Sequence, residues 1–279
     1  MKKLLVIALM VLALLALAAC GGNGDSADTT TQGTQEPPTT QNENTETTPP
    51  PAQAATATIT IAGEQFSTDL TSLDLSMSEL TSEDIIPLQY MINLTSLNLF
   101  ANQIEDISPL SNLTSLIELN ISHNPIVSLG PVSSLTNLEE LSLSRMQTSD
   151  LTPLSGLSNL TSLGASYSYI TDISPLAGLV NLESLYLGSN QIVDISPLAE
   201  LVNLRSLGLP HNEIEDISVI AGLGNFGDGL WLDNNQISDI SPLYGLNIWI
   251  LEISRNRIED FSPIEHLNTS RVFRSGQRP

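Results

Sequence analysis

The side chains best suited to acid–base or metal chemistry in this sequence are its three histidines, His123, His211 and His266. His123 and His211 hold the same position of a recurring sequence pattern, four repeats apart. If each repeat adds one strand to a sheet, the two imidazoles lie about 20 Å apart, because neighbouring strands are about 4.8 Å apart. They therefore cannot share a metal ion or act as a pair, and the sequence favours solvated surface histidines. We expect no catalytic residues and no enzyme activity.

A second set of chemically capable side chains consists of aspartates that recur at one position of the pattern. They are Asp106, Asp150, Asp172, Asp194, Asp216, Asp239 and Asp260. Stacked carboxylates could bind calcium, but this ion takes about six to eight oxygen ligands. One carboxylate per repeat supplies too few, so turn capping and solvation is the favoured interpretation and calcium binding is the alternative. No cofactor is expected.

The only cysteine, Cys20, follows a segment typical of an export signal at residues 1–19. Lys2 and Lys3 begin it, and the apolar run at residues 4–17 is shorter than the roughly 20 residues that a membrane-spanning helix needs. Residues 17–20, Leu-Ala-Ala-Cys, resemble the bacterial lipobox, which implies a thioether-linked diacylglycerol on Cys20 as the first mature residue. A plain membrane anchor, or a signal cleaved elsewhere, is the alternative. We expect a lipid-anchored protein outside the cytoplasm.

The segment that follows, residues 20–55, is rich in Thr, Gln, Pro, Asn and Glu and contains no aliphatic residue larger than Ala. Such a segment cannot bury enough apolar surface to offset the entropy lost on ordering. We expect a disordered linker that lifts the folded part off the membrane.

The charge of the chain excludes some classes of partner. Nine Lys and Arg against 31 Asp and Glu give a formal net charge of −22. Binding of a phosphate backbone needs Lys and Arg to displace counterions, so no nucleic-acid partner is expected. Anionic lipid headgroups would also repel this surface, and membrane attachment should therefore come from the anchor.

The pattern itself is an L-x-x-L-x-L motif that recurs with a period of 22 residues. Its clearest copies begin at Leu94, Leu116, Leu138, Leu160, Leu182 and Leu204. Two shifted copies centre on Leu230 and Leu251, and a longer first copy begins at Leu70, which makes nine turns. Repeats of this length predict a solenoid, in which each turn packs on its neighbours.

The residue types within one repeat predict the structure of one turn. The alternation in Leu97-x-Leu99 predicts a short strand with both leucines inward, and stacked turns would pair these strands into one parallel sheet. An Asn follows the strand in most turns, where its amide can satisfy unpaired backbone groups of the bend. Ser-Pro, as at Ser108-Pro109, predicts a serine N-cap followed by a short 3₁₀ turn on the opposite side. The Asn positions are Asn102, Asn124, Asn190, Asn212, Asn235 and Asn256, whereas Met146 and Ser168 interrupt the series.

The full pattern, L-x-x-L-x-L-x-x-N-x-I-x-D-I-x-P-L-x-x-L, resembles the internalin class of bacterial leucine-rich-repeat proteins over residues 70–267. The resemblance implies a leucine-rich-repeat solenoid, with a curved parallel sheet on the concave face and 3₁₀ turns on the convex face. It also implies that the concave face binds proteins. We place an N-terminal cap and an atypical first repeat at 56–92, the repeats at 93–267, and a tail without a recognisable cap at 268–279. Residues 56–61 alternate like a capping strand, where that family often has a helical cap.

The concave positions carry the remaining functional information. In a chain with only 4% aromatic residues, Phe100, Tyr167, Tyr186 and Trp231 all fall on the expected sheet face. Exposed aromatics among small residues are typical of interface hot spots. The alternative is that some of them fill gaps left by neighbouring glycines. The predicted protein-binding set is Phe100, Arg145, Tyr167, Tyr186, His211, Trp231, Asp233 and Arg255.

These patterns favour a non-catalytic cell-surface lipoprotein that binds a protein partner, such as a host or envelope protein, through its concave face. Two alternatives stay open. One is a structural role in the envelope, and the other is glycan binding, because aromatics beside Asn and Asp also suit sugars.

Overall fold

The computed structural model describes residues 57–265, 267 and 269–273, which all belong to one compact unit. The expected signal at 1–19, Cys20, the linker at 20–55 and His266 lie outside the described residues. In the described part, no helix is long and apolar enough to cross a membrane.

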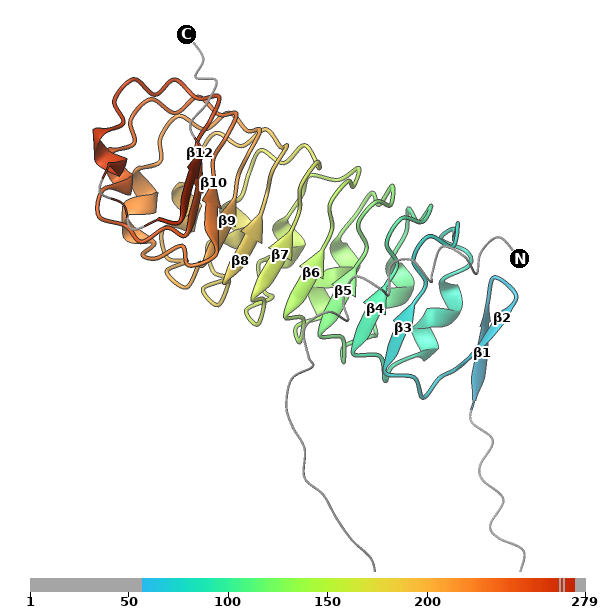
Figure 1. The fold of residues 1–279 in the computed structure, drawn as a ribbon. Coiled ribbons are helices and arrows are strands. Elements are labelled where there is room, and N and C mark those ends of the chain that lie inside the picture. The colour runs from blue at the N-terminus through green and yellow to red at the C-terminus, as the bar shows by residue number, and fades with distance from the viewer. Residues whose placement is uncertain (1–56, 266, 268, 274–279) are drawn as a thin grey trace, which may run out of the picture. The chain divides into compact units, whose positions relative to one another are not determined.

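Ten short strands form one parallel sheet, in which each strand pairs with its neighbours in the chain (Figure 1). Equivalent leucines are register partners, as in Leu97 with Leu119 and Leu163 with Leu185. The strands are β3 (Ser72–Asp74), β4 (Ser96–Asn98), β5 (Glu118–Asn120), β6 (Glu140–Ser142), β7 (Ser162–Gly164), β8 (Ser184–Tyr186), β9 (Ser206–Gly208), β10 (Gly229–Trp231), β11 (Ile250–Glu252) and β12 (Arg271–Phe273).

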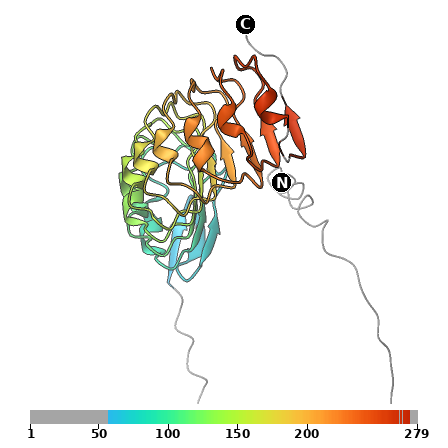
Figure 2. The ribbon, with the colours of Figure 1, turned by 90° about the vertical axis from the view of Figure 1, so that its left-hand side faces the viewer.

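Opposite the sheet, each turn returns through a 3₁₀ helix, so that strands line one face and helices the other (Figure 2). The predicted leucine-rich-repeat solenoid is therefore confirmed. The described helices are η2 (Ile86–Tyr90), η3 (Ser108–Leu110), η4 (Gly130–Ser134), η5 (Thr152–Leu154), η6 (Ser174–Leu176), η7 (Ser196–Leu198), η8 (Ser218–Gly222), η9 (Ser241–Leu243) and η10 (Ser262–Ile264).

Between the two faces lies one aliphatic core. Inward strand residues such as Leu185 and Leu187 are fully buried, and so is Leu198 of η7. The strand alternation puts both leucines of L-x-L on the core side, while the residue between them faces outward. This arrangement leaves the outward positions free to vary without loss of core packing.

The 3₁₀ helices are capped differently from the sequence-based expectation. The serine of each Ser-Pro pair is the first helical residue and provides no N-cap. Instead, an aspartate two residues before the first helical residue accepts a hydrogen bond from the backbone N–H of that first residue, at 2.7–2.9 Å from Oδ1, in five turns with Ser-Pro and in the turns of Thr152 and Ser218. The expectation of a serine cap was wrong, and capping by the recurring aspartates is confirmed.

The predicted asparagine contacts are confirmed. Asn190 Oδ1 accepts hydrogen bonds from the N–H groups of Ser168 and Ile170 in the preceding turn, at 2.9 and 3.1 Å. Its Nδ2 donates to the carbonyl oxygens of Ala165 and Leu187. Each such amide therefore ties two successive turns together. Where the series is interrupted, Met146 is buried and its backbone N–H reaches only the Ser168 hydroxyl, at 3.4 Å.

Both ends of the sheet carry additional strands. At the N-terminal end, β1 (Thr58–Ile61) and β2 (Glu64–Ser67) form an antiparallel hairpin that contributes Ile59 and Ile61 to the core. At the other end, β12 lies within the stretch that we expected to be only a tail. It pairs with β11, and Val272 packs against the core. The structure thus has one more strand than the nine turns counted in the sequence.

Candidate functional site

The sequence-predicted binding residues occupy three successive levels along the sheet face. Tyr186 and Trp231 are strand residues, each between two inward leucines. Phe100 and Asp233 lie two residues beyond the ends of β4 and β10. The other four, Arg145, Tyr167, His211 and Arg255, lie one residue further on, where the chain bends away from the sheet.

That bend has a left-handed backbone in successive turns. The residue before the buried asparagine, or its substitute, has φ between 54° and 60° at Met77, Ala101, His123, Arg145, Tyr167, Ser189, His211, Asn234 and Arg255. None of them is glycine. Residues with a Cβ rarely adopt this conformation, and it persists only where surrounding bonds enforce it. We call this column the rim; the sequence contained no glycine signal for it.

Tyr186 and Trp231 form the aromatic pair of the sheet face. Their ring centroids are 6.4 Å apart with an interplanar angle of 48°, although the residues belong to strands separated by β9. The Tyr186 hydroxyl lies 2.6 Å from Ser206 Oγ, which is buried. Tyr186 remains 41% exposed and Trp231 is half-buried. We refer to these two side chains as the aromatic plate.

The plate rests on glycines. A Cβ added to Gly208 would lie 2.8 Å from the Tyr186 ring, and one added to Gly229 would lie 2.5 Å from the Trp231 ring. Both distances are shorter than real Cβ contacts, so each ring occupies space that any other residue would fill. The gap-filling alternative from the sequence therefore describes the floor of the plate correctly. It does not account for the surface that stays exposed.

Carboxylates and amides surround the plate. Glu252 is the register partner of Trp231 on β11, and its carboxylate accepts hydrogen bonds from the Ser254 backbone and hydroxyl. Asp233 Oδ2 lies 3.9 Å from His211 Nε2, and His211 Nδ1 lies 2.7 Å from Asn234 Nδ2. The predicted residues His211, Trp231 and Asp233 thus belong to one neighbourhood, to which the structure adds Glu252.

A second group of aromatic and cationic side chains lies along the rim of earlier turns. The Phe100 and His123 rings are 4.8 Å apart, and the Arg145 guanidinium lies 4.5 Å from the centre of the Tyr167 ring. Burial, and to a smaller extent the Arg145 charge, lowers the pKa of His123 below its ordinary value of 6.5. Tyr169, which sequence reasoning missed, is 70% exposed beside this group in the chain. Its position normally carries polar residues, and only that departure could have identified it.

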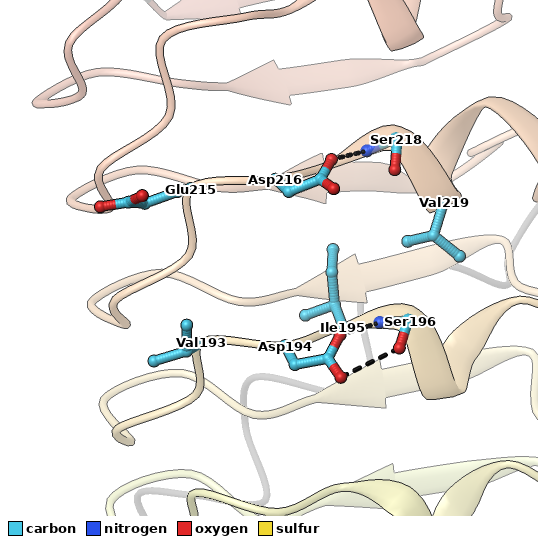
Figure 3. Close-up of a pocket in the computed structure, with 8 residues that line it drawn as sticks. All are labelled: Val193, Asp194, Ile195, Ser196, Glu215, Asp216, Ser218 and Val219. Atoms are coloured by element: carbon cyan, nitrogen blue, oxygen red, sulfur yellow. Dashed lines mark hydrogen bonds between the residues drawn. The ribbon is translucent and has the colours of Figure 1, made fainter.

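Two of the hollows elsewhere on the described surface are lined by several carboxylates. One, of about 390 Å³, covers the sheet face at β3–β6 and is lined by Asp74, Glu118 and Glu140 among serines and asparagines. The other, of about 280 Å³, lies on the flank between two turns, where Val193, Ile195 and Val219 surround Asp194 and Asp216 (Figure 3). Figure 3 shows that both aspartates are directed to the backbone amides they cap, at Ser196 and Ser218. These two carboxylates are therefore engaged in turn capping.

Within the described ranges, no three His, Cys, Asp or Glu side chains gather closely enough to hold a metal ion. The aspartates of successive turns each engage their own turn, as the capping bonds show. The aspartate column is therefore accounted for by turn capping.

A second asparagine column was also missed by sequence reasoning. On the segments that lead into β4, β6, β7, β8 and β9, Asn Nδ2 donates to a backbone carbonyl of the preceding turn at 2.8–3.2 Å. Their role is structural, and the members of the column are Asn93, Asn137, Asn159, Asn181 and Asn203.

Comparison with known proteins supports the same architecture. The family described as "Leucine Rich repeats (2 copies)" matches residues 114–156 and 158–200, and a single "Leucine Rich repeat" matches residues 90–107. No curated protein matches the chain. Among solved structures, an internalin (InlF) from Listeria monocytogenes is 33% identical with a TM-score of 0.64, over 77% of this chain and 71% of that chain. Internalin C2 from the same bacterium is 35% identical with a TM-score of 0.60, over 76% and 85%.

The chain belongs to the internalin family. The sequence resemblance to internalins is thus confirmed at the level of fold and family. A more distant structural relative, TLR13, was solved in a complex with the RNA ssRNA13; it is 29% identical with a TM-score of 0.57, over 69% of this chain and 29% of that chain. Where the resemblance to internalins implied a helical cap, this member has a β-hairpin, β1–β2, ahead of the repeats.

Proposed function

We propose that this internalin-family protein is a non-catalytic binding module that recognises a protein partner through the sheet face. The observation that carries the proposal is the aromatic plate, in which the exposed Tyr186 ring and the half-buried Trp231 ring lie against glycines. Large rigid side chains of this kind supply much contact area at low entropy cost, which is why Tyr and Trp dominate interface hot spots.

The helical side offers little that could replace this surface. Its exposed positions between the 3₁₀ helices and the next strand are mainly small or polar, such as Asn112, Gly156, Gly178 and Glu200. The exposed aromatics of this side are Tyr90 of η2, at one end of the solenoid, and Tyr244 and Trp249, near the other end. The favoured binding face is therefore the sheet.

The test is affinity capture with the full chain and with a Tyr186→Ala/Trp231→Ala double variant. We expect capture of the partner to fall at least tenfold while the circular dichroism spectrum is unchanged, since truncating two hot-spot residues commonly costs about 2 kcal/mol each. Glu200→Gln on the helical side is the matched control and should leave capture intact. Capture that survives the double variant but is lost with Glu200→Gln would contradict the proposal.

The partner is expected to be a protein rather than a nucleic acid. The TLR13 complex shows that a leucine-rich-repeat protein can be solved with RNA, but the present chain carries a formal charge of −22. Phosphate contacts require Lys or Arg, and between residues 4 and 204 this chain has only Arg145. A glycan array is the corresponding test for sugar binding, and a positive result there that requires Trp231 would replace the protein proposal.

We further propose that the protein acts outside the cytoplasm, attached to the membrane by a lipid on Cys20. The support is the sequence alone: a basic start, an apolar run, two alanines and the single cysteine. Mass spectrometry of the mature N-terminus should find a diacylglyceryl cysteine. A mature chain that begins at another residue, or that keeps a free Cys20 thiol, would end this proposal.

A further inference from the structure

We propose that the aromatic plate is a site for a cationic side chain, and that the partner places an arginine or lysine over Tyr186 and Trp231. This inference rests on the proposed function, because the binding face is the same. It adds the chemistry of the group that is recognised.

The geometry of the two rings suits a cation. Attraction between a cation and an aromatic ring acts when the charge lies within about 6 Å of the ring centre. With their centroids 6.4 Å apart, Tyr186 and Trp231 can both meet that condition for one guanidinium or ammonium group. The Tyr186 hydroxyl is already bonded to Ser206, so what the plate presents outward is chiefly its π surface.

Two carboxylates stand next to the rings. Glu252 lies directly opposite Trp231 on the neighbouring strand, about 4.8 Å away at sheet spacing, and Asp233 lies two residues after Trp231 on the same side of the chain. A negative charge beside an aromatic face favours a cation over a neutral apolar group. The plate and its acids therefore point to the same class of ligand.

The charged groups of this protein leave these acids largely available to a ligand. His211 Nε2 lies 3.9 Å from Asp233 Oδ2, so His211 forms an ion pair with this carboxylate only when its imidazole is protonated. Arg255 is exposed on the rim, and within the described part its guanidinium forms no ion pair with Asp233 or Glu252. The hollow at β3–β6 adds Asp74, Glu118 and Glu140 to the same sheet face, so these carboxylates give the sheet face further negative charge.

The probes are two pentapeptides, acetyl-Gly-Ser-X-Ser-Gly-amide, in which X is arginine or its neutral isostere citrulline. They are titrated into the full chain carrying Trp249→Phe, which leaves Trp231 as the single fluorescent indole. We expect the arginine peptide to perturb Trp231 fluorescence with at least fivefold higher affinity than the citrulline peptide. Raising sodium chloride from about 50 to 500 mM should reduce that difference, because salt screens exposed charges.

Variants separate the contributions. Asp233→Asn with Glu252→Gln should reduce the preference for arginine to the part that the rings supply, whereas Glu200→Gln should not change it. Tyr186→Phe should bind like the parent because the ring remains, and Tyr186→Ala should bind at least fivefold more weakly.

Equal affinity for the two peptides, or a preference for arginine that Asp233→Asn with Glu252→Gln leaves undiminished, would overturn the inference. The failure of the proposed function would look different, because partner capture would then be insensitive to Tyr186→Ala/Trp231→Ala. If capture needs the plate but arginine and citrulline bind alike, the face is the binding site and the cation assignment is wrong.

Discussion

Asn190 is a single side chain that connects four backbone groups across two turns. Replacing it by Ala would leave buried N–H and C=O groups without partners, and each such group costs about 1–3 kcal/mol. We therefore expect Asn190→Ala to lower the free energy of unfolding by at least about 2 kcal/mol, measured by urea denaturation.

Asn181→Ala is the control, because Asn181 Nδ2 donates one hydrogen bond of 2.8 Å to the Ser158 carbonyl at an exposed position. Its loss should cost clearly less than the loss of Asn190. If both variants lowered the free energy of unfolding by the same amount, burial would not increase the contribution of these asparagine hydrogen bonds to stability.

A second prediction at this scale concerns His123. Burial and the neighbouring Arg145 charge both disfavour the imidazolium, so the folded pKa lies below 6.5. Arg145→Gln should move the pKa of His123 back toward 6.5, as followed by NMR titration of the imidazole. Since the unfolded chain takes up the proton first, this site contributes full stability above about pH 6.5 and loses it as pH falls toward the folded pKa. An unchanged pKa in Arg145→Gln would contradict the assignment of that charge.

Single residues also show where sequence reasoning stopped. Outward positions were predictable, because L-x-L alternation determines which side chains face the core. The left-handed rim was not, because residues such as Tyr167 and Arg145 carry no local signal for positive φ. The glycines beside the aromatic positions suggested that some rings fill gaps. That Tyr186 lies against Gly208 was not predictable, because Gly208 belongs to the next turn.

At the scale of the element, the 3₁₀ helices depend on aspartate caps. Hydrogen bonds from the backbone and hydroxyl of Ser174 lower the pKa of Asp172 below 3.8, and Asp194 and Asp216 are lowered by the equivalent bonds from Ser196 and Ser218. Because the folded pKa values lie below the unfolded ones, the stability from these caps is present above about pH 4. It is lost as pH falls through the folded values.

We therefore expect the combined variant Asp172→Asn, Asp194→Asn and Asp216→Asn to flatten the dependence of stability on pH below about pH 4. Asn keeps an oxygen acceptor for the backbone amide, so the helices should persist at neutral pH. Denaturation midpoints between about pH 2 and 7 provide the measurement. If the denaturation midpoints of the parent and the variant fell equally between about pH 4 and pH 2, these caps would not determine the loss of stability in acid.

The elements also divide into those that the sequence predicts and those that it does not. Strands with two leucines, such as β4 and β8, follow from the repeat. The serine cap was a wrong prediction because Asp-x-Ser and Ser-Pro signals overlap, and only the structure shows which oxygen meets the amide. β12 escaped notice because Val272 alone replaces the leucine pair, so the strand is recognisable only by its pairing with β11.

For the molecule as a whole, stability is expected to be local. Strand order follows chain order, so each turn packs mainly on the turns before and after it. Leu185 is fully buried in β8, and Leu185→Ala should cost about 2–5 kcal/mol. Hydrogen exchange should accelerate first in β7–β9. Uniform acceleration from β3 to β12 would show instead that the solenoid unfolds as one unit.

The unbroken register from β3 to β12 makes the turns of this protein interchangeable units of length. Duplicating one 22-residue turn between Tyr186 and Trp231 would preserve every buried leucine contact type while moving the two rings apart by about 4.8 Å. Deleting the turn that carries Gly208 would bring the rings onto adjacent strands. Unequal recombination within the gene could thus re-space the recognition groups in whole steps, and a lineage could change what it binds without redesigning its core.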